Sequence, residues 1–410
     1  MSRLLRSRFV EASLATLLFG LSLFSYGEER IYGEERSVGL IEEIKWHGFL
    51  SQSFILTDEN DFLGTSTNGS FKFSSAGLGA SWKPCNSIQL SAQALYKQIG
   101  NTKPKGTNLD YAILDWAIVD QFDRGFGLRG GRLMNAYGFY NETRDVAATR
   151  PSILLPESTY IDYLQFLFRS SDSIGLYARS EMGEGTLSFN TNIGRPLVYE
   201  EVVRVIMGGL PGKSATGRIG KNRLLVSQLG YEDARGQWRS ALTYVLYRGN
   251  YEVGPEDILR EGKITSSQLM LSFEYNWDEL QLITEAFRRN LSITDALPFT
   301  IYDEHLGYYF QVGYQFEHGL KPYMRYDAVF LDKDDRQGLL FEAGRRGPAA
   351  FAFAKDITVG MSYTPSFNWN FGVEFHLVDG DYWVPAVENP DPLRQKRYWN
   401  MFLAQAAYRF

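Results

Sequence analysis

The feature that most constrains the fold is a long alternation of apolar and polar residues with a period of two. In 305–317, Leu306, Tyr308 and Phe310 fall on one face, while Gln311 falls on the other. Successive side chains of a β-strand point to opposite faces, so this pattern predicts a strand with one apolar and one polar face. The segment is longer than the roughly 5–6 residues of an average strand, and its length suits a tilted strand that crosses a hydrocarbon layer.

Sixteen such segments can be counted, and we predict them as the strands of one sheet. Their ranges are 44–56, 71–83, 87–98, 107–121, 125–133, 173–182, 185–195, 222–232, 236–248, 264–276, 279–290, 305–317, 319–330, 353–364, 367–378 and 397–410. Short connections, such as 84–86, alternate along the chain with long ones, such as 134–172. This is the layout of an outer-membrane barrel, which must close because a sheet edge in lipid finds no water. We therefore predict an all-β fold: a sixteen-stranded antiparallel transmembrane β-barrel with short periplasmic turns and long extracellular loops.

The polar faces of these strands predict the lining of the barrel. Sixteen strands enclose an interior that is too wide for side chains alone to fill. The residues expected to point inward include Gln89, Ser91, Gln93, Ser188, Asn190, Asn192, Lys321, Tyr323, Arg325 and Asp327. We therefore expect a water-filled channel.

The N-terminus has the three parts of an export signal. A basic start is followed by an apolar stretch, 14–24, and by small residues before position 28. We predict a signal peptide at 1–27, a short periplasmic segment at 28–43 and the transmembrane β-barrel at 44–410.

The last predicted strand ends on two aromatic residues at two-residue spacing, Tyr408 and Phe410. This ending resembles the assembly signal of Gram-negative outer-membrane barrels. Together with the export signal and the sixteen segments, it makes the chain similar to the general porin superfamily over nearly all of its mature length. The resemblance implies a Gram-negative outer-membrane location, a trimer of sixteen-stranded barrels, and a long third loop that folds inward. Residues 138–145 and 149–152 loosely resemble the corresponding stretch of phosphate-selective-type porins, from which we carry over no phosphate selectivity.

The third long connection, 134–172, is the longest and is the expected constriction loop. Its candidate constriction residues are Glu142, Arg144, Asp145 and Arg150. The candidate residues of the facing wall are Arg129, Arg132, Arg179, Arg289, Lys321 and Arg325. Opposed charged walls would create a transverse field, and a ring of fixed charge sets ion preference. Two alternatives stay open: 142–145 can form a local ion-paired turn, and only one of Arg129 and Arg132 needs to point inward.

These features predict a passive channel for small hydrophilic solutes and ions, with no catalytic residues, no cofactor and no bound metal. The expected partners are outer-membrane lipids, the barrel assembly machinery and further copies of the chain in a homotrimer. A net charge of −6 argues against a nucleic-acid partner, and the single cysteine, Cys85, excludes an intrachain disulfide. The alternatives are an outer-membrane hydrolase built around His305 with Asp303 or Glu304, and a soluble β-propeller or sandwich. A loose divalent-ion site among the aspartates of 331–352 also stays open.

Overall fold

The computed structural model describes residues 44–102, 106–199, 203, 217–255, 257, 259–297 and 300–410. These residues fall in one compact unit, 41–410. The predicted signal peptide, 1–27, and the predicted periplasmic segment, 28–43, lie outside the described residues.

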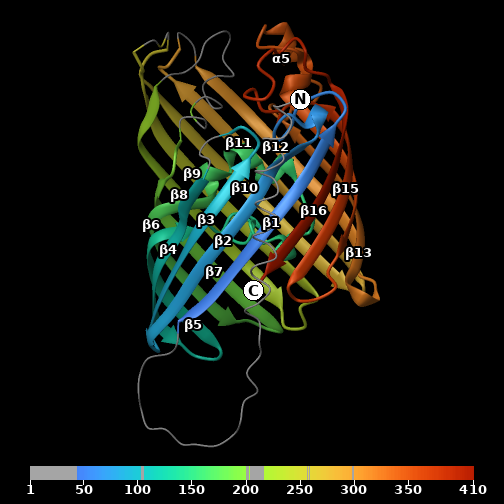
Figure 1. Ribbon diagram of the computed structural model, residues 1–410. Coiled ribbons are helices and arrows are strands. Elements are labelled where there is room, and N and C mark those ends of the chain that lie inside the picture. The colour runs from blue at the N-terminus through green and yellow to red at the C-terminus, as the bar shows by residue number, and fades with distance from the viewer. Residues whose placement is uncertain are drawn as a thin grey trace, which may run out of the picture. The chain divides into compact units, whose positions relative to one another are not determined.

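All sixteen predicted strands are present, and they form one sheet (Figure 1). The strands are β1 (Lys45–Thr57), β2 (Ser70–Cys85), β3 (Ile88–Ile99), β4 (Gly106–Asp120), β5 (Arg124–Met134), β6 (Ser170–Glu181), β7 (Gly185–Pro196), β8 (Arg218–Asp233), β9 (Trp238–Glu252), β10 (Gly262–Trp277), β11 (Leu280–Thr294), β12 (Ile301–Tyr314), β13 (Leu320–Phe330), β14 (Phe353–Tyr363), β15 (Trp369–Gly380) and β16 (Tyr398–Arg409). Some strands begin earlier than predicted: β8 begins at Arg218 rather than 222, and β12 at Ile301 rather than 305. These ends lack a regular alternation, since 218–221 reads Arg-Ile-Gly-Lys and 301–304 reads Ile-Tyr-Asp-Glu, so the period-two pattern does not mark them.

In the part of the chain that the structure describes, helical structure is confined to short turns in the connections. These are η2 (Ser66–Asn68), η3 (Ala147–Thr149), α2 (Glu157–Tyr160), η4 (Asp162–Leu164), α3 (Gln165–Arg169), η5 (Glu317–Gly319), α5 (Leu339–Ala343) and η6 (Ala349–Ala352). Among the described residues, no helix has both the length and the apolar character needed to cross a membrane.

The sheet closes on itself through an antiparallel pairing of its first and last strands. β1 pairs with β16, with Ser53 opposite Gln405, and every other strand pairs with its neighbours in sequence. The seam continues past the end of β16, where the N–H of Phe410 donates to the carbonyl of Gly48 at 3.0 Å. The predicted sixteen-stranded antiparallel barrel is confirmed, and the alternative of a β-propeller or sandwich is wrong.

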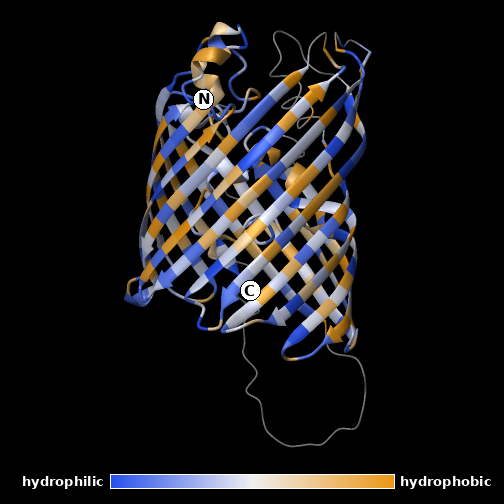
Figure 2. Ribbon diagram, turned by 180° about the vertical axis from the view of Figure 1, so that it is seen from behind, coloured by the Kyte–Doolittle hydropathy of each residue, from blue (hydrophilic) through white to orange (hydrophobic). Residues whose placement is uncertain are grey.

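The outer face of the barrel is apolar and exposed. Ile174 on β6 and Leu271 on β10 have exposed fractions of 69% and 59%, and Phe371, Val373 and Phe375 alternate on β15 in the same way. Figure 2 shows the resulting alternation of hydrophobic and hydrophilic residues along the strands. A belt of this kind matches acyl chains and not water.

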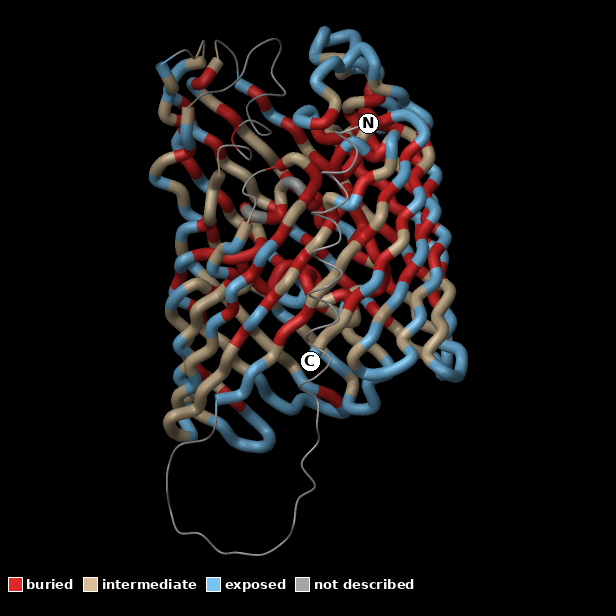
Figure 3. The backbone as a smooth tube through the Cα atoms, viewed as in Figure 1, coloured by how far each residue is buried: buried red, intermediate tan, exposed pale blue. Residues whose placement is uncertain are grey.

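The inner face is less uniformly polar than the sequence predicts. The register places Gln93, Asn190 and Arg325 on the inner face, as predicted. Other inner positions are apolar and buried, however, among them Met270 and Leu403. They belong to a large buried cluster that also includes residues of 134–172. Buried positions gather in the middle part of the barrel, whereas its two ends carry most of the exposed ones (Figure 3). The expected wide, water-filled interior is therefore partly occupied by protein.

A charge on the outer face tests the assignment of the apolar belt. The variant Leu271→Arg should destabilise the barrel by about 2–4 kcal/mol if residue 271 lies near the bilayer midplane, because the guanidinium must then enter hydrocarbon. The free energy of unfolding, measured by denaturant titration in lipid vesicles, reports the effect. Asn190→Arg on the inner face is the control and should cost much less. Equal costs for the two variants would contradict the assignment.

Candidate pore constriction

The connection between β5 and β6 runs across the inside of the barrel. We call residues 135–169 the inner loop. It is held by side chains that point inward from strands far apart around the wall: β3, β8, β10, β11, β12, β13, β15 and β16. The inner loop therefore spans the lumen from one wall to the other.

Glu285 on β11 is the first anchor of the inner loop. Its buried carboxylate accepts hydrogen bonds from the backbone N–H of Phe139 at 2.9 Å and from the hydroxyl of Tyr160 at 2.7 Å. It also accepts from the hydroxyls of Ser272 at 2.6 Å and Tyr309 at 2.8 Å. Four donors compensate the cost of burying this charge, and two of them belong to the loop.

Gly138 allows the loop to approach this anchor closely. Its backbone has a φ of 60°, and a Cβ atom there would lie 2.2 Å from the hydroxyl of Tyr160 and 2.7 Å from Glu285 Oε1. Its carbonyl accepts a hydrogen bond from Gln228 on β8 at 2.9 Å. Glycine is therefore required at this position by both backbone conformation and space.

Glu374 on β15 is the second anchor, on another part of the wall. Its carboxylate accepts the backbone N–H groups of Ile153 at 2.6 Å and Leu154 at 3.1 Å. Tyr323 donates its hydroxyl to the same carboxylate, and His376 Nε2 lies 3.2 Å from it. A wall carboxylate thus satisfies two backbone donors that the loop itself leaves unpaired.

Arg325 on β13 binds the same stretch of the loop from the neighbouring wall. Its guanidinium donates to Ser152 Oγ at 2.8 Å and to the carbonyl of Leu154 at 2.9 Å. The side chain is fully buried and lies 3.8 Å from the carboxylate of Asp356. Arg325 points inward as predicted, but it holds the loop and does not face open solvent.

A buried ionic cluster fixes the loop on the opposite side. Asp145 lies 2.6 Å from Lys97 Nζ on β3 and 2.7 Å from Arg169, which in turn lies 2.5 Å from Asp110 on β4. Burial acts to raise the pKa of Asp145, but the positive charges of Arg169 and Lys97 outweigh it and lower that pKa. Asp145 therefore stays ionised and ties the loop to β3.

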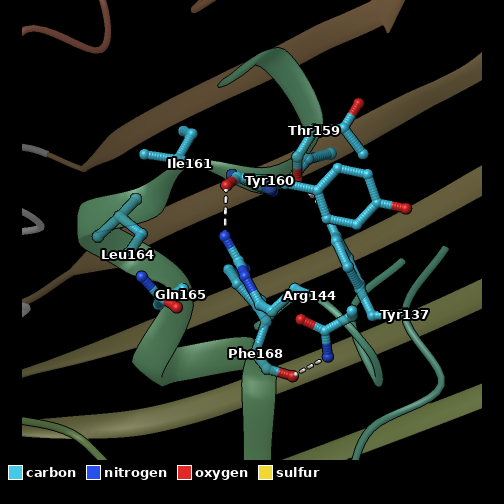
Figure 4. Close-up of a pocket in the computed structure, with 10 residues that line it drawn as sticks. Tyr137, Arg144, Thr159, Tyr160, Ile161, Leu164, Gln165 and Phe168 are labelled. Atoms are coloured by element: carbon cyan, nitrogen blue, oxygen red, sulfur yellow. Dashed lines mark hydrogen bonds between the residues drawn. The ribbon is translucent and has the colours of Figure 1, made fainter. Parts of the chain in front are cut away.

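Arg144 is also internal to the loop. It is buried, and its guanidinium donates to the carbonyl of Tyr160 at 2.9 Å (Figure 4). The guanidinium also donates to the carboxylate of Asp162 at 2.9 Å. The partners of Arg144 and Asp145 are thus distant in sequence, so 142–145 does not form the local ion-paired turn that the sequence left open.

The other two candidate constriction residues differ in exposure. Arg150 donates to Gln405 on β16 at 2.8 Å and is partly buried. Glu142 is exposed inside the barrel. The surrounding protein raises the pKa of Glu142, and the positive charge of Arg129 opposes this shift.

The strand register decides which of the candidate wall residues point into the lumen and which point outward. Arg129, in the middle of β5, points inward and lies 2.8 Å from Asp115. Arg179, near the short turn after β6, also points inward and lies 3.0 Å from Asp120. Arg129 also lies over the ring of Tyr177, 4.3 Å from its centroid.

Two more wall residues, Lys321 and Arg289, also point inward. Lys321 donates to Gln281. Arg289 is buried against the inner loop.

Arg132 is the correction among the wall residues. It pairs in register with Ala112 and Asp172, on the outer face that carries Ile174. The odd residues of β5 point inward, so Arg132 lies on the opposite side of the wall from Arg129. Its guanidinium binds Asp172 at 2.8 Å and does not line the lumen.

A second group of residues covers the inner loop at the end of the barrel that bears the long connections. The rings of Phe62, Trp383 and Trp399 pack with centroids 5.0 Å and 5.1 Å apart, in the same buried cluster as Leu154. Glu388 joins the first and eighth long connections, because it accepts the N–H of Gly64 at 2.5 Å. We call these side chains, together with residues 381–397, the cover; it was not predicted from the sequence.

The two acids considered as partners of His305, Asp303 and Glu304, bind arginines in the structure. Its Nδ1 lies 3.1 Å from the hydroxyl of Tyr382. Asp303 binds Arg346 at 2.7 Å, and Glu304 points outward to Arg288 at 2.6 Å. Within the described ranges, no group of three or more His, Cys, Asp or Glu side chains is placed to hold a metal ion.

The comparisons with known proteins agree with the barrel geometry. No protein-family model and no curated protein matches the sequence. The outer membrane channel DcaP of Acinetobacter baumannii has a TM-score of 0.54 at 14% identity, over 90% of this chain and 97% of that one. The anion-selective porin from Comamonas acidovorans has a TM-score of 0.55 at 11% identity, over 90% of this chain and 99% of that one. The chain has the porin fold. OmpT, an outer membrane protein of Vibrio cholerae, matches with a TM-score of 0.53 at 12% identity, over 92% of this chain and 100% of that one.

Within this porin fold, the anchors of the inner loop were missed from the sequence. Glu285 and Glu374 occupy inward positions of their strands, where a polar residue is expected in any water-filled barrel. The available signal was their charge at mid-strand, since an acid far from both strand ends needs a partner inside the barrel.

Glu374→Gln should loosen the inner loop without opening the barrel. Replacing a charged acceptor weakens two buried hydrogen bonds, which typically costs about 1–3 kcal/mol. Amide hydrogen exchange of Ile153 and Leu154 should therefore speed up roughly 5- to 150-fold. Glu304→Gln, on the outer face, should leave the exchange unchanged. If both variants behave like the wild type, Glu374 is not an anchor.

The cover should depend on pH. Burial raises the pKa values of Asp381 and Glu388, each to about 7. Both acids then bind a proton more tightly in the folded cover than in an unfolded chain, where their pKa values are about 4. Their contribution is complete below about pH 4 and is lost as pH rises through about 7.

Amide exchange in 381–397 should accordingly be faster at about pH 8 than at about pH 5, after correction for intrinsic exchange rates. Glu388→Gln should reduce this difference, because the amide cannot ionise. Asp391→Asn, at an exposed acid of the same connection, is the control and should retain it. An unchanged pH dependence in Glu388→Gln would contradict the assignment.

Proposed function

We propose that the protein is a porin of the Gram-negative outer membrane, a channel for passive diffusion of small hydrophilic solutes and ions. The observation that carries the proposal is a closed sixteen-stranded barrel with an apolar outer face and a loop folded across its interior. Such a barrel satisfies every strand edge in lipid and leaves space inside for a permeation path. The shared fold with solved outer-membrane channels supports the same proposal.

The permeation path follows the wall formed by β4–β7. The walls of β11 and β15 are buried against the inner loop by the anchors Glu285 and Glu374. On the other side, the side chains of Asp115 and Arg129 keep exposed fractions of 22% and 35%, and Glu142 of the loop is exposed near Arg129. Opposite charges then face each other across the narrow part of the path, which favours polar solutes that align in the field.

We infer how the protein assembles in the membrane from its last strand, its apolar belt and a solved structure of the same fold. The outward Tyr408 and the terminal Phe410 form the signal for the barrel assembly machinery, and the apolar belt contacts outer-membrane lipids. One solved form of the Vibrio cholerae OmpT is described as a trimer, at 12% identity and a TM-score of 0.53. We propose a homotrimer for this chain as well.

Single-channel recording in a planar bilayer tests the proposal. Purified protein should give stable conductance steps, in groups of three if each assembly holds three pores. The conductance should be small, because the inner loop and the cover occupy much of the lumen. A protein that inserts, shows the heat-dependent gel migration of a folded barrel, and passes no current would overturn the channel function.

Arg129→Glu should shift the ion preference towards cations. The substitution reverses the charge that faces Glu142 and adds to the negative charge of Asp115. The reversal potential under a salt gradient should move in the cation-selective direction. Arg132→Glu is the matched control, since Arg132 lies on the same strand but faces outward. Equal shifts in both variants would place the path elsewhere.

A further inference from the structure

Buried cationic side chains in the described part of the chain come in two kinds. Five are almost fully buried: Lys97, Arg144, Arg169, Arg289 and Arg325. Four of them lie within 4 Å of a carboxylate, at distances from 2.5 to 3.8 Å. Among the described residues, Arg289 is the one of the five without such a partner. A buried charge without a counter-charge is costly, so Arg289 requires an explanation.

The surroundings of Arg289 fix the guanidinium but do not neutralise it. The side chain is 8% exposed, and its Nε donates to Gln268 Oε1 at 2.7 Å. Its Cζ lies 5.4 Å from the ring centroid of Phe168 on the inner loop and 5.0 Å from that of Phe287. Aromatic faces attract a cation, but they supply no formal negative charge.

The neighbouring carboxylates already have partners. Glu285, on the same strand, accepts hydrogen bonds from four donors. Asp303 lies on the adjacent β12 and forms a two-point ion pair with Arg346 at 2.7 and 2.9 Å. Neither acid can approach Arg289 without breaking these contacts, so the protein itself does not provide the missing charge.

Arg289 lines a small cavity between the wall and the inner loop. Tyr137, Arg144 and Phe168 of the loop line it as well (Figure 4). The charge of Arg144 is already balanced by Asp162, so the cavity carries the uncompensated charge of Arg289. Its volume is about 10 Å³, which is room for about one water-sized particle.

We propose that Arg289 binds a small anion of halide size in this cavity. The cavity is too small for a sulfate or a sugar acid, and its charge selects against a cation. The anion would contact the wall through Arg289 and the inner loop through the loop residues that line the cavity. Its binding would therefore stabilise the packed position of the loop, independently of whether the barrel conducts.

Bromide locates the site directly. Crystals of the full-length mature protein grown in sodium bromide should show an anomalous peak beside Arg289. The peak should disappear in Arg289→Gln. Arg239→Gln is the matched control, because Arg239 also points inward and stacks on a loop ring, Phe139, at 4.3 Å, but has Glu274 as its partner at 2.6 Å. The control should retain the peak.

Solution measurements separate specific binding from crystal conditions. The thermal unfolding midpoint in detergent should be higher in sodium chloride than in sodium gluconate at equal ionic strength. Arg289→Gln should abolish this difference, whereas Arg289→Lys, which keeps a positive charge, should retain part of it. Circular dichroism of the barrel identifies a variant that fails to fold. If Arg289→Gln fails to fold, Arg289→Lys is compared with the wild type in its place.

Two results would overturn the proposal. One is a cavity that shows ordered density but no anomalous signal, which would mean that it holds water, bound by the unpartnered Oδ1 of Asn141. The other is a bromide peak or a chloride effect that persists unchanged in Arg289→Gln, which would place the anion elsewhere.

Discussion

The structure depends on the need to pair every strand edge that would otherwise meet lipid. The pairing of β1 with β16 removes the last free edge, and it continues to Phe410 at the very end of the chain. A closed ladder also fixes the direction of every side chain, because residues that are paired on neighbouring strands point to the same face of the sheet. The apolar belt and the polar lining are therefore two consequences of the same hydrogen-bonded ring.

The same alternation of inward and outward residues explains which strands and faces could be predicted from the sequence. Where large apolar residues alternate with polar ones, as on β10, β12 and β15, both the strand and its faces were predicted correctly. On β5 the outer apolar series stops at Leu128, because Gly130 and the charged Arg132 follow it on the same face. The adjoining β4 carries a bulge between Ala117 and Val119, which shifts the pairing register. The directions of Arg129 and Arg132 could not be read under these conditions.

The path of the inner loop was beyond prediction for a different reason. Burying an irregular segment inside a barrel leaves backbone N–H groups that no strand can satisfy. Glu285 and Glu374 supply these acceptors from positions more than 100 residues away in sequence. Nothing local in the loop sequence identifies such partners, and on their own strands the two acids look like ordinary lining residues. The anchors emerge only when the ring brings β11 and β15 to face the loop.

This arrangement changes how the charges of the interior act on a solute. The charges of Arg144, Asp145 and Arg169 each lie within 3 Å of an opposite charge, either on another residue of the loop or on the wall. Paired charges of this kind produce fields that fall off quickly with distance, so they shape the loop and contribute little to ion preference. A count of charged residues in the loop is therefore a poor guide to selectivity. The groups that matter are those whose partners leave them exposed, and Glu142 and Arg129 satisfy that condition on the side of the lumen that the loop does not cover.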